Sequence, residues 1–264
     1  MSIRLGVERI GVIVKREIRV KISYKMTILI AGVSVFSGLI SYAFLGNGAV
    51  VSVTSQEYGM SLAAFLVSGV AFSSIITNGL SMFGEYANPS QIEEVMVTPT
   101  DFRLFVLYSS LLSILVGLGT AALLFLVSVL LLGLTFSYNF PLLFAVIILG
   151  VSSSIGLGFI GLGLQLVYKQ TYFLSWLLYS FTSLVGNMIV PVQILPNVLQ
   201  AASYVTPQYY FFTGIRVALG STVAPAYTIL VTFVVYSVLL LFLGLLALRH
   251  GLEFIRHNGT HRWT

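Results

Sequence analysis

An uncharged run limits what this chain can fold into. Residues 104–168, the 65 positions between Arg103 and Lys169, contain no Asp, Glu, Lys or Arg. Three further stretches are also free of these residues: 26–56, 58–84 and 217–248. A helix that crosses the hydrocarbon core of a bilayer needs about 20 apolar residues. We therefore expect an all-α, polytopic membrane protein.

The overall composition agrees with a lipid environment. Of the 264 residues, 58% are hydrophobic and 8% are charged, whereas soluble domains carry about 25% charged residues. The chain has no cysteine, which excludes disulfides, thiolate metal sites and cysteine nucleophiles. Seven of the 13 basic residues lie in the first 25 positions and three follow Leu248. Basic residues at the ends of a membrane protein indicate the cytoplasmic side and not a nucleic-acid partner.

Residues 1–25 have the pattern of an amphipathic helix. Aliphatic residues recur every three or four positions, while basic residues fall mostly on the opposite side. The aliphatic residues are Ile3, Val7, Ile10, Val14, Ile18 and Ile22. A basic amphipathic helix lies in the membrane interface, although the first helix of a soluble cap would show the same pattern. The interleaved charges do not match a cleavable signal peptide.

Residues 26–264 are expected to form a domain of six transmembrane helices. The predicted crossings are about 26–46, 60–83, 104–134, 140–167, a fifth from Tyr172 that weakens near Asn187, and 225–248, which should stop at Arg249-His250-Gly251. An even number of crossings places both termini on one side, and the basic ends make this side the cytoplasm. The loop at 47–59 and the turn at 135–141 would then be extracellular.

The segment 187–224 is too polar for a simple crossing and too apolar for an ordinary loop. Three prolines interrupt it, and Arg216 lies in its second half. We interpret it as the broken end of the fifth helix followed by a helical hairpin that re-enters from outside; a packed extracellular loop is the alternative. Backbone of this kind survives at membrane depth only inside protein or beside water. The predicted pathway or gate residues are Asn78, Gln165, Asn187, Pro191, Gln193, Pro196, Pro207 and Arg216.

The loop at 84–103 carries half of the eight acidic residues of the chain. Asn88 is a favourable N-cap, and Pro89 suits the first helical position. Glu93 and Glu94 then fall near the positive end of the helix dipole, and Pro99 ends the element. We expect a two-turn helix on the cytoplasmic side, which a partner protein could push. A locally stable connection without a partner would show the same pattern.

These features together resemble the permease subunits of ABC-2 type transporters. The matching segments are Lys15–Tyr24 before the first crossing, Gly84-Glu85 and Ile92–Pro99 in the acidic loop, and Pro191–Pro196, Val205–Pro207 and Gly214–Leu219 near the C-terminus. The resemblance implies a half-transporter that pairs with a second permease subunit, identical or not, in the inner (cytoplasmic) cell membrane. It also implies an ATPase subunit that binds ATP and Mg²⁺ below the membrane.

Within this resemblance, residues 88–98 would be the coupling helix and residues 2–22 a connecting helix on the membrane. The residues that would couple to the ATPase are Arg16, Glu17, Glu85, Asn88, Ile92, Glu93, Glu94, Val95, Met96 and Pro99. In the family, transport is usually export.

Other chemistry is not supported by the sequence. There is no phosphate-binding Gly-x-x-x-x-Gly-Lys-Ser/Thr motif, so the chain is not expected to bind ATP itself. The dinucleotide-like run Gly156–Gly161 lies inside the uncharged stretch and is interpreted as helix packing. All three histidines lie in the tail beyond Arg249, and no acid lies within a crossing. We therefore predict no catalytic residue, no metal site and no cofactor in this chain.

The cargo can be narrowed only by polarity. An ion-coupled carrier would place ionisable groups inside the bundle, and here the polar groups are neutral. A pathway without fixed charge suits a hydrophobic or amphipathic drug, antibiotic or lipid. A lipid-linked polysaccharide exporter is the alternative, although the stretch from Tyr24 to Phe44 lacks the tryptophan that such family members often carry. A passive channel or lipid scramblase also remains open.

Overall fold

The structure is a computed structural model that describes residues 48–80, 102–168, 180–181 and 183–258. Throughout these residues the regular structure is helical. The elements are α3 (Gly48–Gln56), α4 (Leu62–Leu80), α7 (Phe102–Leu132), α8 (Phe140–Tyr168), the 3-10 turn η1 (Val192–Ile194), α10 (Asn197–Val205), α11 (Pro207–Ala218) and α12 (Ala226–Asn258). The expected all-helical class is confirmed for this part of the chain.

Four helices are long and apolar enough to cross a membrane. They are Leu62–Gly79, Phe105–Leu132, Phe140–Tyr168 and Ala226–Ile255. These spans correspond to the second, third, fourth and sixth crossings expected from the sequence. The first crossing at 26–46, most of the fifth, and the N-terminal helix at 1–25 lie outside the described residues.

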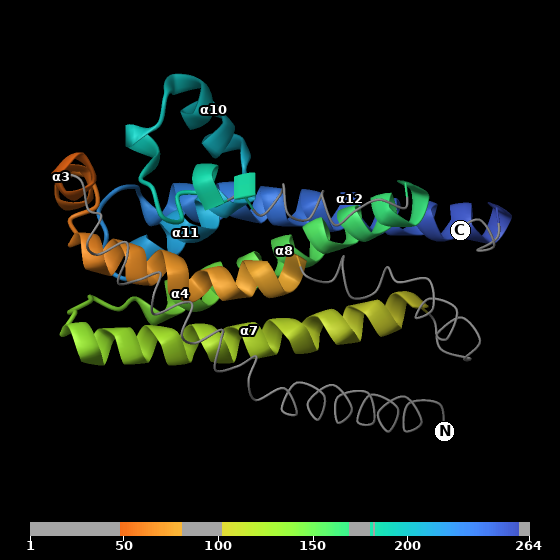
Figure 1. Ribbon diagram of the computed structural model, residues 1–264, viewed down its shortest axis with the longest axis horizontal. Coiled ribbons are helices and arrows are strands. Elements are labelled where there is room, and N and C mark those ends of the chain that lie inside the picture. Colours follow the sequence, from red (N-terminus) through yellow and green to blue (C-terminus); the bar gives the residue numbers. More distant parts are fainter. Residues whose placement is uncertain (1–47, 81–101, 169–179, 182, 259–264) are drawn as a thin grey trace.

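The long helices lie side by side along the long axis of the molecule (Figure 1). α4 packs against α7 and α8, and α8 packs against α12. Short α3 lies at one end of the bundle, which we call the α3 end, and the C-terminus of α12 lies at the other. The loop between α7 and α8 is also at the α3 end, where the amides of Ser137 and Asn139 donate to the last carbonyls of α11.

Two boundaries differ from expectation. Most of the expected loop at 47–59 is helix α3, which pairs backbone groups that a loop would leave open. The prediction that the last crossing stops at Arg249-His250-Gly251 is wrong, because α12 continues to Asn258. Arg249 pairs with Glu253 one turn later at 2.9 Å, and Gly251 is buried against the backbone of Gly163. Helix packing thus overrides a local stop signal.

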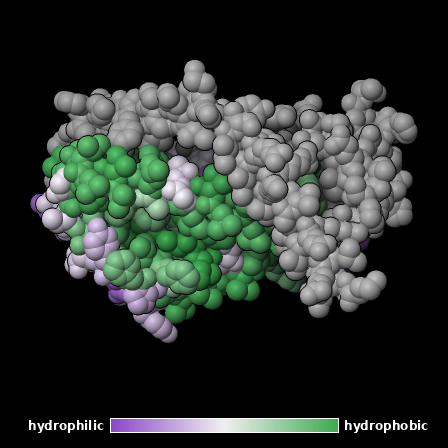
Figure 2. Space-filling view, turned by 90° about the horizontal axis from the view of Figure 1, so that it is seen from below, coloured by the Kyte–Doolittle hydropathy of each residue, from purple (hydrophilic) through white to green (hydrophobic). Residues whose placement is uncertain are grey.

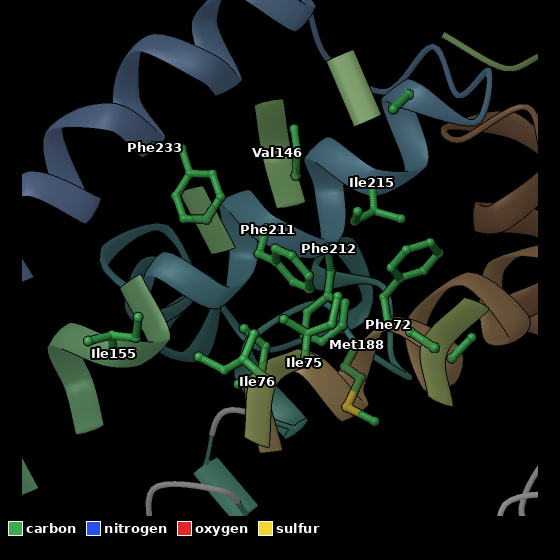
Figure 3. Close-up of a cluster of buried hydrophobic side chains, with 14 of the residues drawn as sticks. Phe72, Ile75, Ile76, Val146, Ile155, Met188, Phe211, Phe212, Ile215 and Phe233 are labelled. Atoms are coloured by element: carbon green, nitrogen blue, oxygen red, sulfur yellow. The ribbon is translucent and has the colours of Figure 1, made fainter. Parts of the chain in front are cut away.

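The core lies where α11 inserts among the longer helices. Nine of the 12 residues of α11 are buried, whereas α10 leaves Val198 and Val205 exposed. The core side chains come from four helices and from the segment before η1 (Figure 3). They are Phe72, Ile75 and Ile76 of α4, Val146 and Ile155 of α8, Phe211, Phe212 and Ile215 of α11, Phe233 of α12, and Met188 of the segment before η1. Thus α11 is part of the interior of the bundle, although it is too short to cross a membrane.

The outer faces of the long helices are apolar. α7 and α12 expose large hydrophobic side chains along much of their length, including Leu115, Leu123, Leu126 and Leu130 on α7 and Val235, Val238, Phe242 and Leu245 on α12. Figure 2 shows how strongly hydrophobic residues dominate the described surface on one side. Soluble monomers rarely expose apolar patches of this extent. The described helices therefore belong to a multi-pass membrane protein.

Candidate functional site

A buried polar cluster lies at the α3 end of the bundle. Its side chains come from four places in the chain: the loop before α4, the break that follows residues 183–185, η1, and α11. We call it the Arg216 cluster and define it as Tyr58, Asn187, Gln193, Thr213 and Arg216. These residues are far apart in sequence, so the cluster fixes the relative position of several elements.

Arg216 is the centre of the cluster and is fully buried. One terminal nitrogen of its guanidinium donates to the carbonyl of Asn187. The other donates to the carbonyls of Met188 at 2.8 Å and Phe65 at 3.1 Å. The guanidinium carbon lies 3.4 Å from the ring centroid of Phe65. A single side chain of α11 therefore binds both α4 and the break after residue 185.

The positive charge of Arg216 is balanced without an acid from the part of the chain that the structure describes. The described residues form one salt bridge, between Arg249 and Glu253, and none of their carboxylates pairs with Arg216. A buried cation is costly unless it is paired. Here carbonyl dipoles just beyond helical residues 183–185 and the face of Phe65 supply the negative potential. Burial lowers the pKa of Arg216 to about 9, so the guanidinium stays charged at neutral pH.

Asn187 has a backbone conformation suited to ending a helix. Its φ is 60°, in the left-handed region. Among the described residues, Asn187 is the one residue other than glycine that has a positive φ. Asparagine tolerates this region better than most residues. Both polar atoms of its side chain are hydrogen-bonded: Oδ1 accepts from the Tyr58 hydroxyl at 3.0 Å, and Nδ2 donates to Thr213 at 3.0 Å. The break is therefore held by specific bonds.

Tyr58 connects the loop before α4 to this break. Its hydroxyl lies 3.0 Å from Asn187 Oδ1 and 3.1 Å from Gln193 Oε1, and the two oxygens share its single proton. Burial raises the pKa of Tyr58, so the phenol remains a donor. The carbonyl of Tyr58 accepts from Ser221 at 2.8 Å. Tyr58 is therefore hydrogen-bonded both to residues that precede α11 in the chain and to Ser221, which follows it.

Gly69 permits the close contact between α4 and the break. A Cβ atom at this position would lie 2.0 Å from the carbonyl oxygen of Met188 and 3.0 Å from the guanidinium of Arg216. Because any larger residue would displace that carbonyl, a glycine is required here. This contact and the Arg216 bonds hold the same segment from two sides.

The structure brings together some of the predicted pathway residues and not others. Asn187, Gln193 and Arg216 meet in one cluster. Pro191 and Pro196 are the N-cap residues directly before η1 and α10, and Pro207 is the first residue of α11.

Asn78 and Gln165 lie elsewhere. Asn78 of α4 donates to the Ser74 carbonyl at 2.7 Å. Gln165 of α8 is buried, and its Oε1 has no hydrogen-bond partner among the described residues. All the predicted coupling residues from Arg16 to Pro99 lie outside the described residues.

Tyr58, Phe65, Gly69 and Thr213 were not predicted from the sequence. Each lies in or beside an apolar run in which Tyr, Phe, Gly and Thr are common, so its type gave no signal. The signal that existed was Arg216: apart from Lys169, it is the single charge in residues 104–248. A buried arginine requires several acceptors, and the partners follow only from the fold.

The chemistry of the cluster is that of a structural clamp. It contains no carboxylate and no thiol, and the described residues hold no group of three His, Cys, Asp or Glu residues that could bind a metal. The hydrogen bonds of the Arg216 guanidinium and of the neutral side chains can hold the helices together. A nucleophile with a base is not present in this cluster.

The comparison with known proteins agrees with a role in the membrane. Residues 8–220 match the family model described as ABC-2 type transporter, which covers more than half of the chain. No curated protein matches the sequence. The match includes α3 to α11 and thus the whole Arg216 cluster. The chain therefore belongs to the ABC-2 type transporter family, as a transmembrane permease.

Proposed function

We propose that this chain is the permease subunit of an ATP-driven exporter. In this proposal a separate ATPase subunit binds ATP and Mg²⁺, and a second permease subunit completes the pathway. The inner (cytoplasmic) cell membrane is the proposed location, with both termini in the cytoplasm. The α3 end, with the Arg216 cluster, would then be extracellular.

One observation carries the proposal of an external motor. The candidate spans in α4, α7 and α8 contain no Asp, Glu, Lys, Arg or His, and in α12 such residues begin only at Arg249. Proton- and ion-coupled carriers need ionisable groups inside the bundle. Arg216, the buried charge of the described helices, already donates to three carbonyls. Energy for uphill transport would therefore come from a partner.

The cargo is proposed to be hydrophobic or amphipathic, such as a drug, an antibiotic or a lipid. The support is the absence of fixed charge from the spans in α4, α7 and α8 and from α12 before Arg249, together with the apolar, aromatic core that these helices share. Transport by alternating access would begin at the predicted coupling helix 88–98. Movement there would change the packing of the bundle and loosen the Arg216 cluster. A lipid-linked polysaccharide is a larger cargo that would use the same route.

A charge reversal tests the coupling. We expect the double variant Glu93→Lys and Glu94→Lys to lose binding of the ATPase while the permease stays folded. Co-purification with the co-expressed ATPase subunit measures binding, and thermal unfolding in detergent measures folding. Arg249→Glu, a charge reversal on α12, is the matched control. Unchanged ATPase binding in the double variant contradicts the proposed docking site.

A passive channel or scramblase is separated from an ATP-driven exporter by nucleotide dependence. The purified complex would be reconstituted in liposomes with a fluorescent phospholipid and, in parallel, with a hydrophobic dye. ATP-dependent movement of either probe supports the exporter. Movement that needs neither ATP nor the ATPase supports the passive alternative.

A further inference from the structure

Helices α8 and α12 meet along a seam with a regular register. The hydroxyl of Ser237 donates to the carbonyl of Leu149 at 3.1 Å, across 88 positions of sequence. The same separation recurs at Gly156 with Gly244 and at Gly163 with Gly251. Successive contacts are seven residues apart on both helices, which is the repeat of parallel helices that pack side by side. We call these three pairs the α8–α12 seam.

The glycines of the seam bring two backbones into direct contact. A Cβ atom on Gly244 would lie 2.4 Å from the carbonyl oxygen of Gly156, and one on Gly251 would lie 2.7 Å from that of Gly163. From the other helix, a Cβ on Gly163 would lie 2.4 Å from the carbonyl of Ala247. No side chain separates the helices at these points. Such contacts cannot slide without a clash of main-chain atoms.

α11 is attached to this seam near the α3 end. Gly150 lies one residue after Leu149, and a Cβ on it would lie 2.3 Å from the ring of Phe211. A Cβ on Gly214 would lie 2.9 Å from Val146 of α8 and 3.3 Å from Ile229 of α12. Arg216 follows two residues later on the same helix. α11 is therefore packed tightly against both helices of the seam.

α7 belongs to the other side of the bundle. It packs against α4, where a Cβ on Gly117 would lie 2.9 Å from the carbonyl oxygen of Ser74, and Ser74 donates to the carbonyl of Gly117 at 3.0 Å. In Figure 1, α7 and α12 lie on opposite sides of α4 and α8. The closest main-chain contacts thus pair α8 with α12 and α4 with α7. The two pairs meet through a side chain, where a Cβ on Gly79 of α4 would lie 2.4 Å from the Cβ of Ser154 on α8.

We propose that α8, α11 and α12 move as one rigid body during the transport cycle and that the movement takes place relative to α4 and α7. This inference rests on the proposed ATP-driven function. The 33 residues of α12 span about 50 Å at 1.5 Å per residue, more than the roughly 30 Å hydrocarbon core. The rigid body therefore extends from the cytoplasmic end to the Arg216 cluster. A displacement at one end reaches the bonds of Arg216 with Phe65 on α4.

Spin-label distances test the division directly. The natural chain has no cysteine, so two introduced cysteines are the sole labelling sites within this chain. One pair, Ile148→Cys and Leu246→Cys, reports on α8 and α12; the other, Leu123→Cys and Leu246→Cys, reports on α7 and α12. All three positions are about half exposed or more. Distances would be measured in the reconstituted complex with its ATPase, without nucleotide and with ATP under conditions that block hydrolysis.

We expect the α8–α12 distance to stay unchanged by ATP while the α7–α12 distance changes. If the α8–α12 distance changes as much as the α7–α12 distance, the rigid body does not exist, although ATP-driven movement does. If neither distance changes while the ATPase is bound and hydrolyses ATP, the movement itself is absent. That result overturns both this inference and the proposed coupling.

Discussion

Arg216 and Phe65 contact each other twice, through main chain and through side chain. The guanidinium donates to the carbonyl of Phe65 at 3.1 Å and lies over the ring of the same residue at 3.4 Å. α4 and α11 are thus joined at one position by two different interactions. Together these interactions hold α4 and α11 against each other near the α3 end.

The first prediction concerns the shape of the Arg216 cation. Arg216→Lys keeps the charge, but one ammonium group cannot reach the same three carbonyls or stack on Phe65. We expect the free energy of unfolding to fall by about 3 kcal/mol, because a buried charge loses its partners. Thermal unfolding in detergent measures the effect. Arg249→Lys is the control, since its salt bridge is exposed and should change stability by less than about 1 kcal/mol. Equal effects of the two substitutions would contradict a special role for Arg216.

The second prediction uses the backbone of Asn187. Asn187→Gly and Asn187→Ala both remove the bonds to Tyr58 and Thr213, but only glycine accepts a φ of 60° freely. We expect the alanine variant to be less stable than the glycine variant by about 1 kcal/mol, the cost of a left-handed conformation for an L side chain. Comparison of the two unfolding temperatures isolates this term. An alanine variant at least as stable as the glycine variant is incompatible with the turn described at residue 187.

The third prediction concerns the space beside Gly69. Gly69→Ala places a methyl group 2.0 Å from the Met188 carbonyl, so α4 and the break must separate. Overpacking of this kind costs about 1–3 kcal/mol. In contrast, a methyl group at Gly119 on α7 would have no atom within 4 Å, and Gly119→Ala should be neutral or stabilising. Hydrogen exchange of the amides around residue 188 should increase in the first variant and not in the second.

The fourth prediction tests the α8–α12 seam at its middle and at one end. Gly244→Ala lies in the middle of the seam and Gly251→Ala near its end, and both add a methyl group against main-chain oxygen. We expect both to lower the unfolding temperature and to weaken ATP-dependent transport of the probe that the wild type moves. The Gly119→Ala variant again serves as the control. Full stability and transport in Gly244→Ala would show that the helices separate there without cost.

The sequence predicted the described long helices well because their signal is composition. The 65-residue uncharged run became α7 and α8, divided close to the predicted turn. The ends of helices were less predictable. Gly251 follows Arg249 and His250 in the order typical of a helix stop, but in the structure it is the small residue that lets α12 pack on Gly163. A glycine required for packing and a glycine that ends a helix look identical in one sequence.

The Arg216 cluster was predictable only in part for a related reason. Asn187, Gln193 and Arg216 are polar residues in an apolar region, and their rarity made them visible. Tyr58 and Phe65 lie more than 120 positions from Asn187 and Arg216, respectively, and contact them only after α4 and α11 pack. The same limit applies to the seam, because the spacing of seven becomes evident when α8 and α12 are aligned.

The length of α7 affects the membrane around the protein. Its apolar span of 28 residues, Phe105–Leu132, is about 42 Å long at 1.5 Å per residue, compared with a hydrocarbon thickness of about 30 Å. Tilt alone would have to reach about 45° to absorb the difference, beyond the usual range of transmembrane helices. Leu130, Leu131 and Leu132 at its end are exposed and need acyl chains as neighbours. We therefore expect the surrounding bilayer to thicken beside α7, so that lipids with longer chains suit this protein better than short ones.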